Sequence, residues 1–337
     1  MITISLCMIV KNEEAILSRC LDTVADLVDE IVIVDTGSTD KTKEIASGYT
    51  DKIYDFQWID DFSAARNFAF SKATKEYIYT ADADEVISPE NRQKFLQLKE
   101  NLLPEIEIVQ MIYGNQLQFG TVYNYDEEYR PKLFKRLREF VWQEAIHEMV
   151  RLEPVIYDSD IVITHMPTSP HGARDLKNFR KQTVEGKKLS KRLQNMYAKE
   201  LLLVGDPSDL ALAAEYFEEA AADPERDSEE IMEACCVLAR SYRMSGHMLK
   251  FFKFANKVLA GAVNSEICLE MGLFYEENQD PEEAAIWFYN AVYETQPILS
   301  LESGRRHSLQ GLVRCYEKMG ITEQADIYRE ELKHLEE

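Results

Sequence analysis

The sequence predicts an α/β domain with a mostly parallel central sheet, followed by an all-α domain of helical repeats. Two observations predict this class. Strand-like and helix-like segments alternate over residues 1–80, as in parallel β-α-β units. From about residue 200 onward, pairs of helices recur at a regular spacing, as in stacked repeats.

The chain of 337 residues is long enough for two domains. A cluster of turn-forming residues at 167–172 marks the expected boundary. The expected division is a catalytic-type domain at 1–170, a helical linker at 171–200 and a repeat domain at 201–337. The composition, 45% hydrophobic and 29% charged, is that of a globular chain with a sizeable core.

The net charge of −22 bears on the choice of partner. Residues 191–337 alone carry 15 basic and 28 acidic side chains, a net charge of −13. Such a surface repels nucleic acid and anionic membranes, so neither is expected as a partner. A nucleotide remains possible, because a metal ion and a few local arginines decide that binding.

The cysteines and the N-terminus favour a cytoplasmic protein. None of the six cysteines forms a C-x-x-C pair, and reduced, buried thiols are expected. The first residues lack a basic segment and a cleavage site, so no signal peptide is expected. No apolar run approaches the ~20 residues of a membrane span, so no transmembrane helix is expected either.

The first part of the chain alternates strands and helices in order. Apolar or β-branched runs predict buried strands at 2–10, 30–34, 52–55 and 77–80. Helical periodicity and turn residues predict helices at 15–28, 40–46 and 62–73, with another opening at Ser88. Ligands of such sheets bind beyond the carboxyl ends of the strands.

Polar clusters lie at three of these strand ends: residues 12–13, 35–40 and 82–85. The chain contains neither a G-x-G-x-x-G loop nor a G-K-[ST] loop, so dinucleotide-binding and P-loop folds are disfavoured. Something other than a glycine-rich loop must then neutralise any bound phosphate.

The D-x-D run at Asp82 and Asp84 offers that neutralisation. In an extended chain this spacing places both carboxylates on one face, where a divalent cation would remove their repulsion. Magnesium sites commonly use one or two carboxylates and leave the other positions to phosphate oxygens. The alternative is a solvated acidic turn before the helix that opens at Ser88.

Four segments in register resemble glycosyltransferase family 2: residues 8–14 (MIVKNEE), 33–42 (IVDTGSTDKT), 61–67 (DFSAARN) and 81–85 (ADADE). The resemblance covers about the first 170 residues. It implies a GT-A fold, a nucleotide-sugar donor that is most often a UDP-sugar, and Mg²⁺ or Mn²⁺ as cofactor.

The resemblance also implies roles for individual residues. Asn12 and Glu13 would line the nucleotide pocket, and Asp35 would bind the base or the ribose. Arg66 would lie beside the base and the diphosphate. Asp82 would bind the ribose or the metal, and Asp84 would ligate the metal directly. The residue types suit these roles, because carboxylates accept from N–H and hydroxyl groups and arginine forks onto phosphate oxygens. For Asp35, simple turn chemistry is the alternative.

Residues 130–136 (RPKLFKR) and 146–148 (IHE) resemble a subset of the family. That subset includes lipopolysaccharide-core glucosyltransferases and S-linked bacteriocin-peptide glycosyltransferases with helical tails. It implies an inverting reaction, with Glu148 as the general base for the acceptor proton and His147 as its neighbour, positioning it or facing the metal. Glu144 is a rival base, and a surface His-Glu ion pair is the alternative.

His165 ends the last expected strand, at 161–165. In the related enzymes with repeat tails a histidine also follows this strand. We therefore expect His165 to complete the metal shell, where imidazole suits Mn²⁺ better than Mg²⁺. A hydrogen-bonded structural histidine is the alternative.

The tail is expected to be helical from residue 175 onward. Turns at 205–206, 246–247, 279–280 and 320–321 each join two helices, a unit similar to tetratricopeptide repeats. Their uneven spacing predicts inserted loops at 222–228 and 296–305.

Stacked helix pairs present a surface suited to peptides or partner proteins. The expected function is therefore sugar transfer to a protein or peptide side chain, with a possible homodimer through the tail. The same chemistry on a cell-surface or lipid-linked glycan is one alternative, and a tail that only stabilises the enzyme is another. A third alternative is a non-catalytic repeat scaffold with a degenerate transferase domain.

Overall fold

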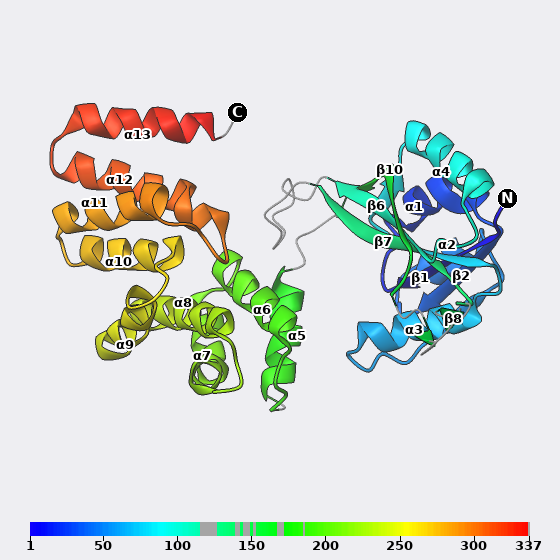
Figure 1. The fold of residues 1–337 in the computed structure, drawn as a ribbon, viewed down its shortest axis with the longest axis horizontal. Coiled ribbons are helices and arrows are strands. Elements are labelled where there is room, and N and C mark those ends of the chain that lie inside the picture. Colours follow the sequence, from blue (N-terminus) through cyan, green and yellow to red (C-terminus); the bar gives the residue numbers. More distant parts are fainter. Residues whose placement is uncertain are drawn as a thin grey trace. The chain divides into compact units, whose positions relative to one another are not determined.

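The fold was examined in a computed structural model (Figure 1). The structure describes residues 1–114, 127–138, 142–143, 149–150, 153–166, 172–184 and 186–335. The chain divides into two compact units, Met1–Pro170 and His171–Glu337. The first is an α/β unit and the second is helical, so the predicted fold class is confirmed.

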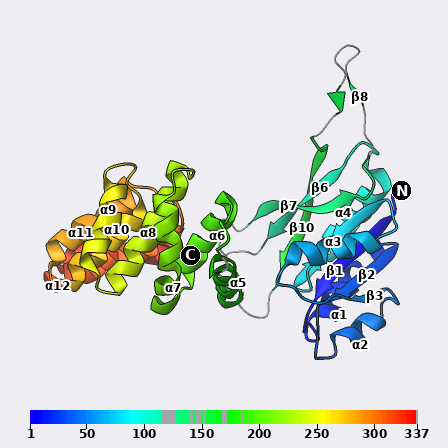
Figure 2. The ribbon, with the colours of Figure 1, turned by 90° about the horizontal axis from the view of Figure 1, so that it is seen from below.

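The α/β unit is built on an eight-stranded sheet of order β3-β2-β1-β4-β7-β6-β10-β5. Its strands are β1 (Ile4–Val10), β2 (Glu30–Asp35), β3 (Ile53–Asp55), β4 (Tyr77–Thr80), β5 (Glu85–Ile87), β6 (Ile108–Gly114), β7 (Glu128–Lys135) and β10 (Ile156–His165). Strand β1 pairs in parallel with β2 and with β4, and β2 pairs in parallel with β3 (Figure 2). The carboxyl ends of these four strands therefore share one edge, which we call the carboxyl edge.

Helices cover both faces of the sheet (Figure 1). They are α1 (Leu17–Val24) with the short helix η1 (Ala25–Leu27), α2 (Thr42–Ser47), α3 (Phe62–Lys72) and α4 (Pro89–Asn101). Leu6 of β1 packs in one core with Leu17 of α1 and Phe95 of α4, while Cys7 packs in a second core with Ala69 of α3. Successive strand residues point to opposite faces, so a continuous apolar run fills both cores.

Two elements differ from the sequence prediction. The expected helix at 15–28 is shorter and ends in a 3₁₀ turn. The strand β5 was not predicted, because three residues after an acidic turn give no periodic signal; it pairs antiparallel with β10. A two-stranded ribbon, β8 (Trp142–Gln143) with β9 (Met149–Val150), stands apart from the main sheet.

The helical unit consists of antiparallel helices packed in sequence (Figures 1 and 2). They are α5 (Gly172–Val184), α6 (Lys191–Leu203), α7 (Pro207–Ala222), α8 (Ser228–Met244), α9 (Met248–Leu259), α10 (Ser265–Glu277), α11 (Pro281–Tyr289), α12 (Arg306–Lys318) and α13 (Thr322–His334). The turns after α8, α10 and α12 contain Gly246, Gln279 and Gly320, each with positive φ. These are three of the four predicted turns.

One aromatic side chain joins three of these helices. A Cβ atom added to Gly272 of α10 or to Gly311 of α12 would lie 2.6 Å from the ring of Phe288 in α11. Phe288 is fully buried, so the two glycines leave the space that its ring fills. In the described part of the chain, no helix has the length and apolar character needed to span a bilayer.

Candidate functional site

The carboxyl end of β2 places Asp35 in a buried turn. Asp35 Oδ1 accepts hydrogen bonds from the backbone N–H groups of Gly37 and Ser38, at 2.9 Å each. The residue is 2% exposed. Asp35 Oδ2 is also buried and meets no hydrogen-bond partner within the described residues. Turn chemistry therefore uses one oxygen of this carboxylate and does not engage the other.

Strand β1 ends beside this turn. Asn12 is exposed, has a φ of 56°, and its Oδ1 accepts from Thr39 N at 2.8 Å. The N–H of Glu13 donates to Thr42 Oγ1 at 2.7 Å. These bonds hold the ends of β1 and β2 together, so Asn12, Glu13 and Asp35 lie in one region, as expected for a shared pocket.

Helix α3 brings Arg66 to the same edge. Asp61 caps the helix by accepting from Ala64 N at 3.0 Å. One turn further on, Arg66 Nη2 lies 2.8 and 3.2 Å from the two carboxylate oxygens of Asp82. Burial acts to raise the pKa of Asp82, but the charges of Arg66 and Lys132 bring it below its ordinary value.

Asp84 faces a different partner. His165 Nε2 lies 3.2 Å from Asp84 Oδ2, because β5 pairs antiparallel with β10 and sets His165 opposite Glu85. The two aspartates lie in a turn and not in the extended chain from which their shared face was predicted. The chain turns after β4, with Glu85 N donating to Asp82 O at 3.1 Å, so the alternation of an extended strand does not apply.

Sequence reasoning gave no role to a second group of side chains at this edge. Glu85 is 2% exposed and pairs with the buried Lys132 of β7 at 2.5 Å. The guanidinium of Arg130 lies 3.9 Å from the ring centroid of Tyr113, and the ammonium of Lys132 lies 5.1 Å from it. The sequence contains a signal for this group: residues 130 and 132 are basic and lie in a strand-like run, where a buried charge must have a partner.

Glu148, His147 and the rival base Glu144 lie outside the described residues. Their roles therefore remain predictions.

The candidate metal ligands at this edge are Asp82, Asp84 and His165. No group of three or more His, Cys, Asp or Glu side chains within the described residues is placed to hold a metal. A hard cation bound with a diphosphate needs only one or two carboxylates, because phosphate oxygens and water fill the other positions. Asp84 with His165 beside it, and Asp82 two residues away, fits such a cation.

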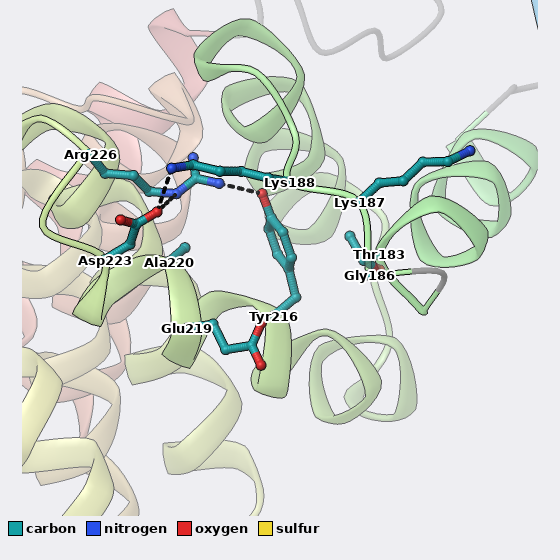
Figure 3. A pocket seen from close by; sticks show the side chains of 9 residues that line it. All are labelled: Thr183, Gly186, Lys187, Lys188, Tyr216, Glu219, Ala220, Asp223 and Arg226. Atoms are coloured by element: carbon teal, nitrogen blue, oxygen red, sulfur yellow. Dashed lines mark hydrogen bonds and ion pairs between the residues drawn. The ribbon is translucent and has the colours of Figure 1, made fainter.

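A cavity of about 250 Å³ lies in the helical unit, remote from these residues in the chain. Figure 3 shows Arg226 within it, between Asp223 and Tyr216. Arg226 donates to Tyr216 Oη at 3.1 Å and to Glu230 Oε1 at 2.7 Å. The hydrogen bonds of Arg226 thus connect α7 with α8. We assign the cavity no ligand.

Comparison with known proteins identifies relatives that match part of this chain. A TPR repeat-containing protein of Synechococcus elongatus is 38% identical over 150 residues, which are 44% of this chain and 36% of that protein. The SPbeta prophage-derived glycosyltransferase SunS of Bacillus subtilis is 32% identical over 161 residues, 47% of this chain and 36% of SunS. The match thus spans about a third of the length of these relatives.

A solved structure shows a more distant likeness. It is glucosyl-3-phosphoglycerate synthase from Mycobacterium tuberculosis in complex with Mn²⁺ and UDP-glucose, at 15% identity and a TM-score of 0.38. The alignment covers 54% of this chain and 77% of the synthase. No property of the synthase is carried to this chain on that likeness.

The family comparison is more specific. The model of the family "Glycosyl transferase family 2" matches residues 5–151, which hold the four motifs and most of the sheet. The resemblance stated from those motifs is confirmed. The α/β unit therefore contains a glycosyl transferase family 2 domain.

Proposed function

We propose that this protein is a glycosyltransferase that moves a sugar from a nucleotide sugar, most simply a UDP-sugar, to an acceptor. The observation that carries the proposal is the position of Asp35, Arg66, Asp82 and Asp84 at the carboxyl edge of the parallel strands β1, β2 and β4. That edge is where ligands of such sheets bind. The family match of residues 5–151 supports the same reading.

The side chains divide the work of donor binding. The buried Asp35 offers a carboxylate oxygen to the N–H or hydroxyl groups of a nucleoside. Arg66 offers a guanidinium that matches phosphate oxygens. Asp84, with Asp82 and His165, would hold Mg²⁺ or Mn²⁺, which when bound stabilises negative charge on the departing diphosphate.

The acceptor side of the proposal concerns a protein or peptide side chain. The reaction inverts the anomeric centre, with Glu148 taking the acceptor proton and His147 beside it. The stacked helices of the second unit offer a surface for a polypeptide acceptor or for a second copy of the chain. A glycan acceptor would leave the donor half of this scheme unchanged.

The test of the donor half is nucleotide release from a panel of UDP-sugars and other nucleotide sugars, without acceptor. The assay is run with Mn²⁺, with Mg²⁺ and with EDTA. Slow hydrolysis of one donor that stops in EDTA is the expected result, and it names the sugar. Failure of every donor, together with no rise in melting temperature from UDP and metal, would establish the scaffold alternative instead.

The acceptor half needs its own measurement. Removal of residues 191–337 should leave acceptor-independent donor hydrolysis intact and weaken transfer to the true acceptor. Equal transfer by the shortened chain would remove the helical unit from acceptor binding. Sedimentation of the full chain tests the homodimer separately.

A further inference from the structure

Glu85 and Lys132 form a buried ion pair at the carboxyl edge. Lys132 Nζ lies 2.5 Å from Glu85 Oε1, and the two side chains are 7% and 2% exposed. Glu85 directly follows Asp84 in the chain and stands opposite His165 in the sheet. The pair therefore adjoins two of the three residues that we propose for the metal.

Local backbone structure aims Lys132 at this place. The register between β6 and β7 shifts from Val109–Leu133 to Gln110–Pro131, which leaves Lys132 as an extra residue. A bulge of this kind redirects a side chain and is common next to active sites. The ammonium lies over the face of Tyr113, whose ring also packs against His165.

Stability alone explains this pair poorly. Taking two charges out of water offsets most of their attraction, so apolar side chains of similar size would serve folding as well. Moreover, Glu85 Oε2 is buried and has no hydrogen-bond partner among the described residues. A carboxylate that served only folding would be expected to have both oxygens satisfied.

A second ion pair in the same unit, with a buried lysine and a partly exposed aspartate, gives the contrast. Lys99 Nζ lies 2.7 Å from Asp29 Oδ2 and donates to Leu27 O at 3.1 Å. The same Asp29 oxygen accepts from Ile4 N at 2.8 Å. This pair ties α4 to the start of β1, far along the strand from the carboxyl edge, and it has the extra bonds that a structural role requires.

Two carboxylates at the carboxyl edge each have a basic partner. Arg66 neutralises Asp82, and Lys132 neutralises Glu85. The other cation beside Tyr113, Arg130, pairs with Glu128. Without Lys132, Glu85 would add a third carboxylate charge next to Asp82 and Asp84, and an approaching diphosphate would be repelled.

We propose that Lys132 is a positioning residue for the nucleoside diphosphate: it cancels the charge of Glu85, so that Glu85 adds no further negative charge beside Asp82 and Asp84, where a diphosphate and its cation would bind. This inference rests on the proposed function. It assigns Lys132 no contact with the substrate, so its effect must disappear when Glu85 is also neutral.

Three variants test this assignment: Lys132→Met, Glu85→Gln and the double variant. The readouts are the Kd of UDP with and without Mg²⁺, the Kd of Mn²⁺ alone, and the melting temperature. Lys132→Met should weaken UDP about tenfold, and Glu85→Gln should tighten UDP without metal and weaken Mn²⁺. The double variant should return both affinities to within about threefold of the parent.

Lys99→Met is the matched control, because it removes a second buried lysine that is paired with a carboxylate. It should lower the melting temperature and leave the Kd of UDP within about twofold. If Lys132→Met does not fold, the double variant decides: parental UDP affinity supports charge cancellation. A double variant that folds but binds UDP weakly overturns it, since Lys132 would then act on the ligand directly.

A parallel loss of UDP and Mn²⁺ affinity in both single variants would also overturn the assignment, because it indicates a structural role. The proposed function fails in a different way. In that case the parent chain itself binds no nucleotide diphosphate, with or without metal.

Discussion

Strand β2 carries a buried carboxylate at each end, and the two are satisfied very differently. Glu30 at the start is 7% exposed, and Asp35 at the end is 2% exposed. Glu30 accepts from Lys52, Ser5 and both the N–H and the hydroxyl of Thr74. Asp35 accepts two backbone N–H groups on one oxygen, while its other oxygen meets no partner among the described residues.

The difference separates a carboxylate that serves folding from one that we propose for donor binding. Both oxygens of Glu30 are committed to holding β2 to its neighbours, so its bonds leave no capacity for a ligand. Asp35 lies at the edge where ligands of parallel sheets bind, and there an open acceptor has a use. The same contrast separates the pairs Lys99–Asp29 and Lys132–Glu85.

The largest expected effect is on chemistry at the carboxyl edge. Asp84→Asn should lower metal-dependent donor hydrolysis by about 10³-fold or more, because it removes the charge proposed to hold the cation. The melting temperature should stay within about 2 °C of the parent. Loss of folding in a thermal melt, rather than loss of activity alone, would show that Asp84 stabilises the fold instead of binding the cation.

The second prediction concerns the amino end of β2. Burial alone would raise the pKa of Glu30, but bonds from Lys52, Ser5 and Thr74 lower it from 4.5 to about 2. A carboxyl with a lowered folded-state pKa stabilises above its unfolded value, and this stability disappears as the pH falls through the folded value. Glu30→Gln should therefore cost up to about 3 kcal/mol at pH 7.

Denaturant melts of the parent and Glu30→Gln at pH 7 and at progressively lower pH measure this cost. The gap between them should narrow below pH 4.5 and close near pH 2, following the two pKa values. UDP affinity at neutral pH should not change. A gap independent of pH would show that Glu30 stabilises by shape rather than by charge.

The smallest expected effect is at Asp35. Asparagine keeps one oxygen to accept from Gly37 and Ser38, so Asp35→Asn should change the free energy of unfolding by less than about 1 kcal/mol. Replacing the second oxygen with an N–H donor should weaken UDP about tenfold, which isothermal titration can measure. Unaltered UDP affinity with reduced stability would reverse the contrast between the two ends of β2.

Most of the architecture could be predicted from the sequence, because short stretches of the chain specify most strands, helices and turns. The apolar runs that become β1, β2 and β4 are buried on both faces, and the helices of the second unit are separated by turn residues such as Gly246 and Gly320. Strand β5 could not be predicted, since its existence depends on pairing with β10, which is about 80 residues away.

The site was predictable as a set of residues but not as a set of contacts. Asp82 and Asp84 were expected to act together, yet a turn directs one to Arg66 and the other to His165. The Lys132–Glu85 pair depends on a bulge in β7, and a bulge is set by the register of two distant strands. Neither feature has a signature in a short window of sequence.

Phe288 couples the helices α10, α11 and α12 of the helical unit. Its ring occupies space left by Gly272 in α10 and Gly311 in α12, so neither neighbouring helix can leave without exposing it. Helices α10, α11 and α12 should therefore open as one cooperative block in native-state hydrogen exchange. These helices would then unfold together, as a small domain does, and not one helix pair at a time.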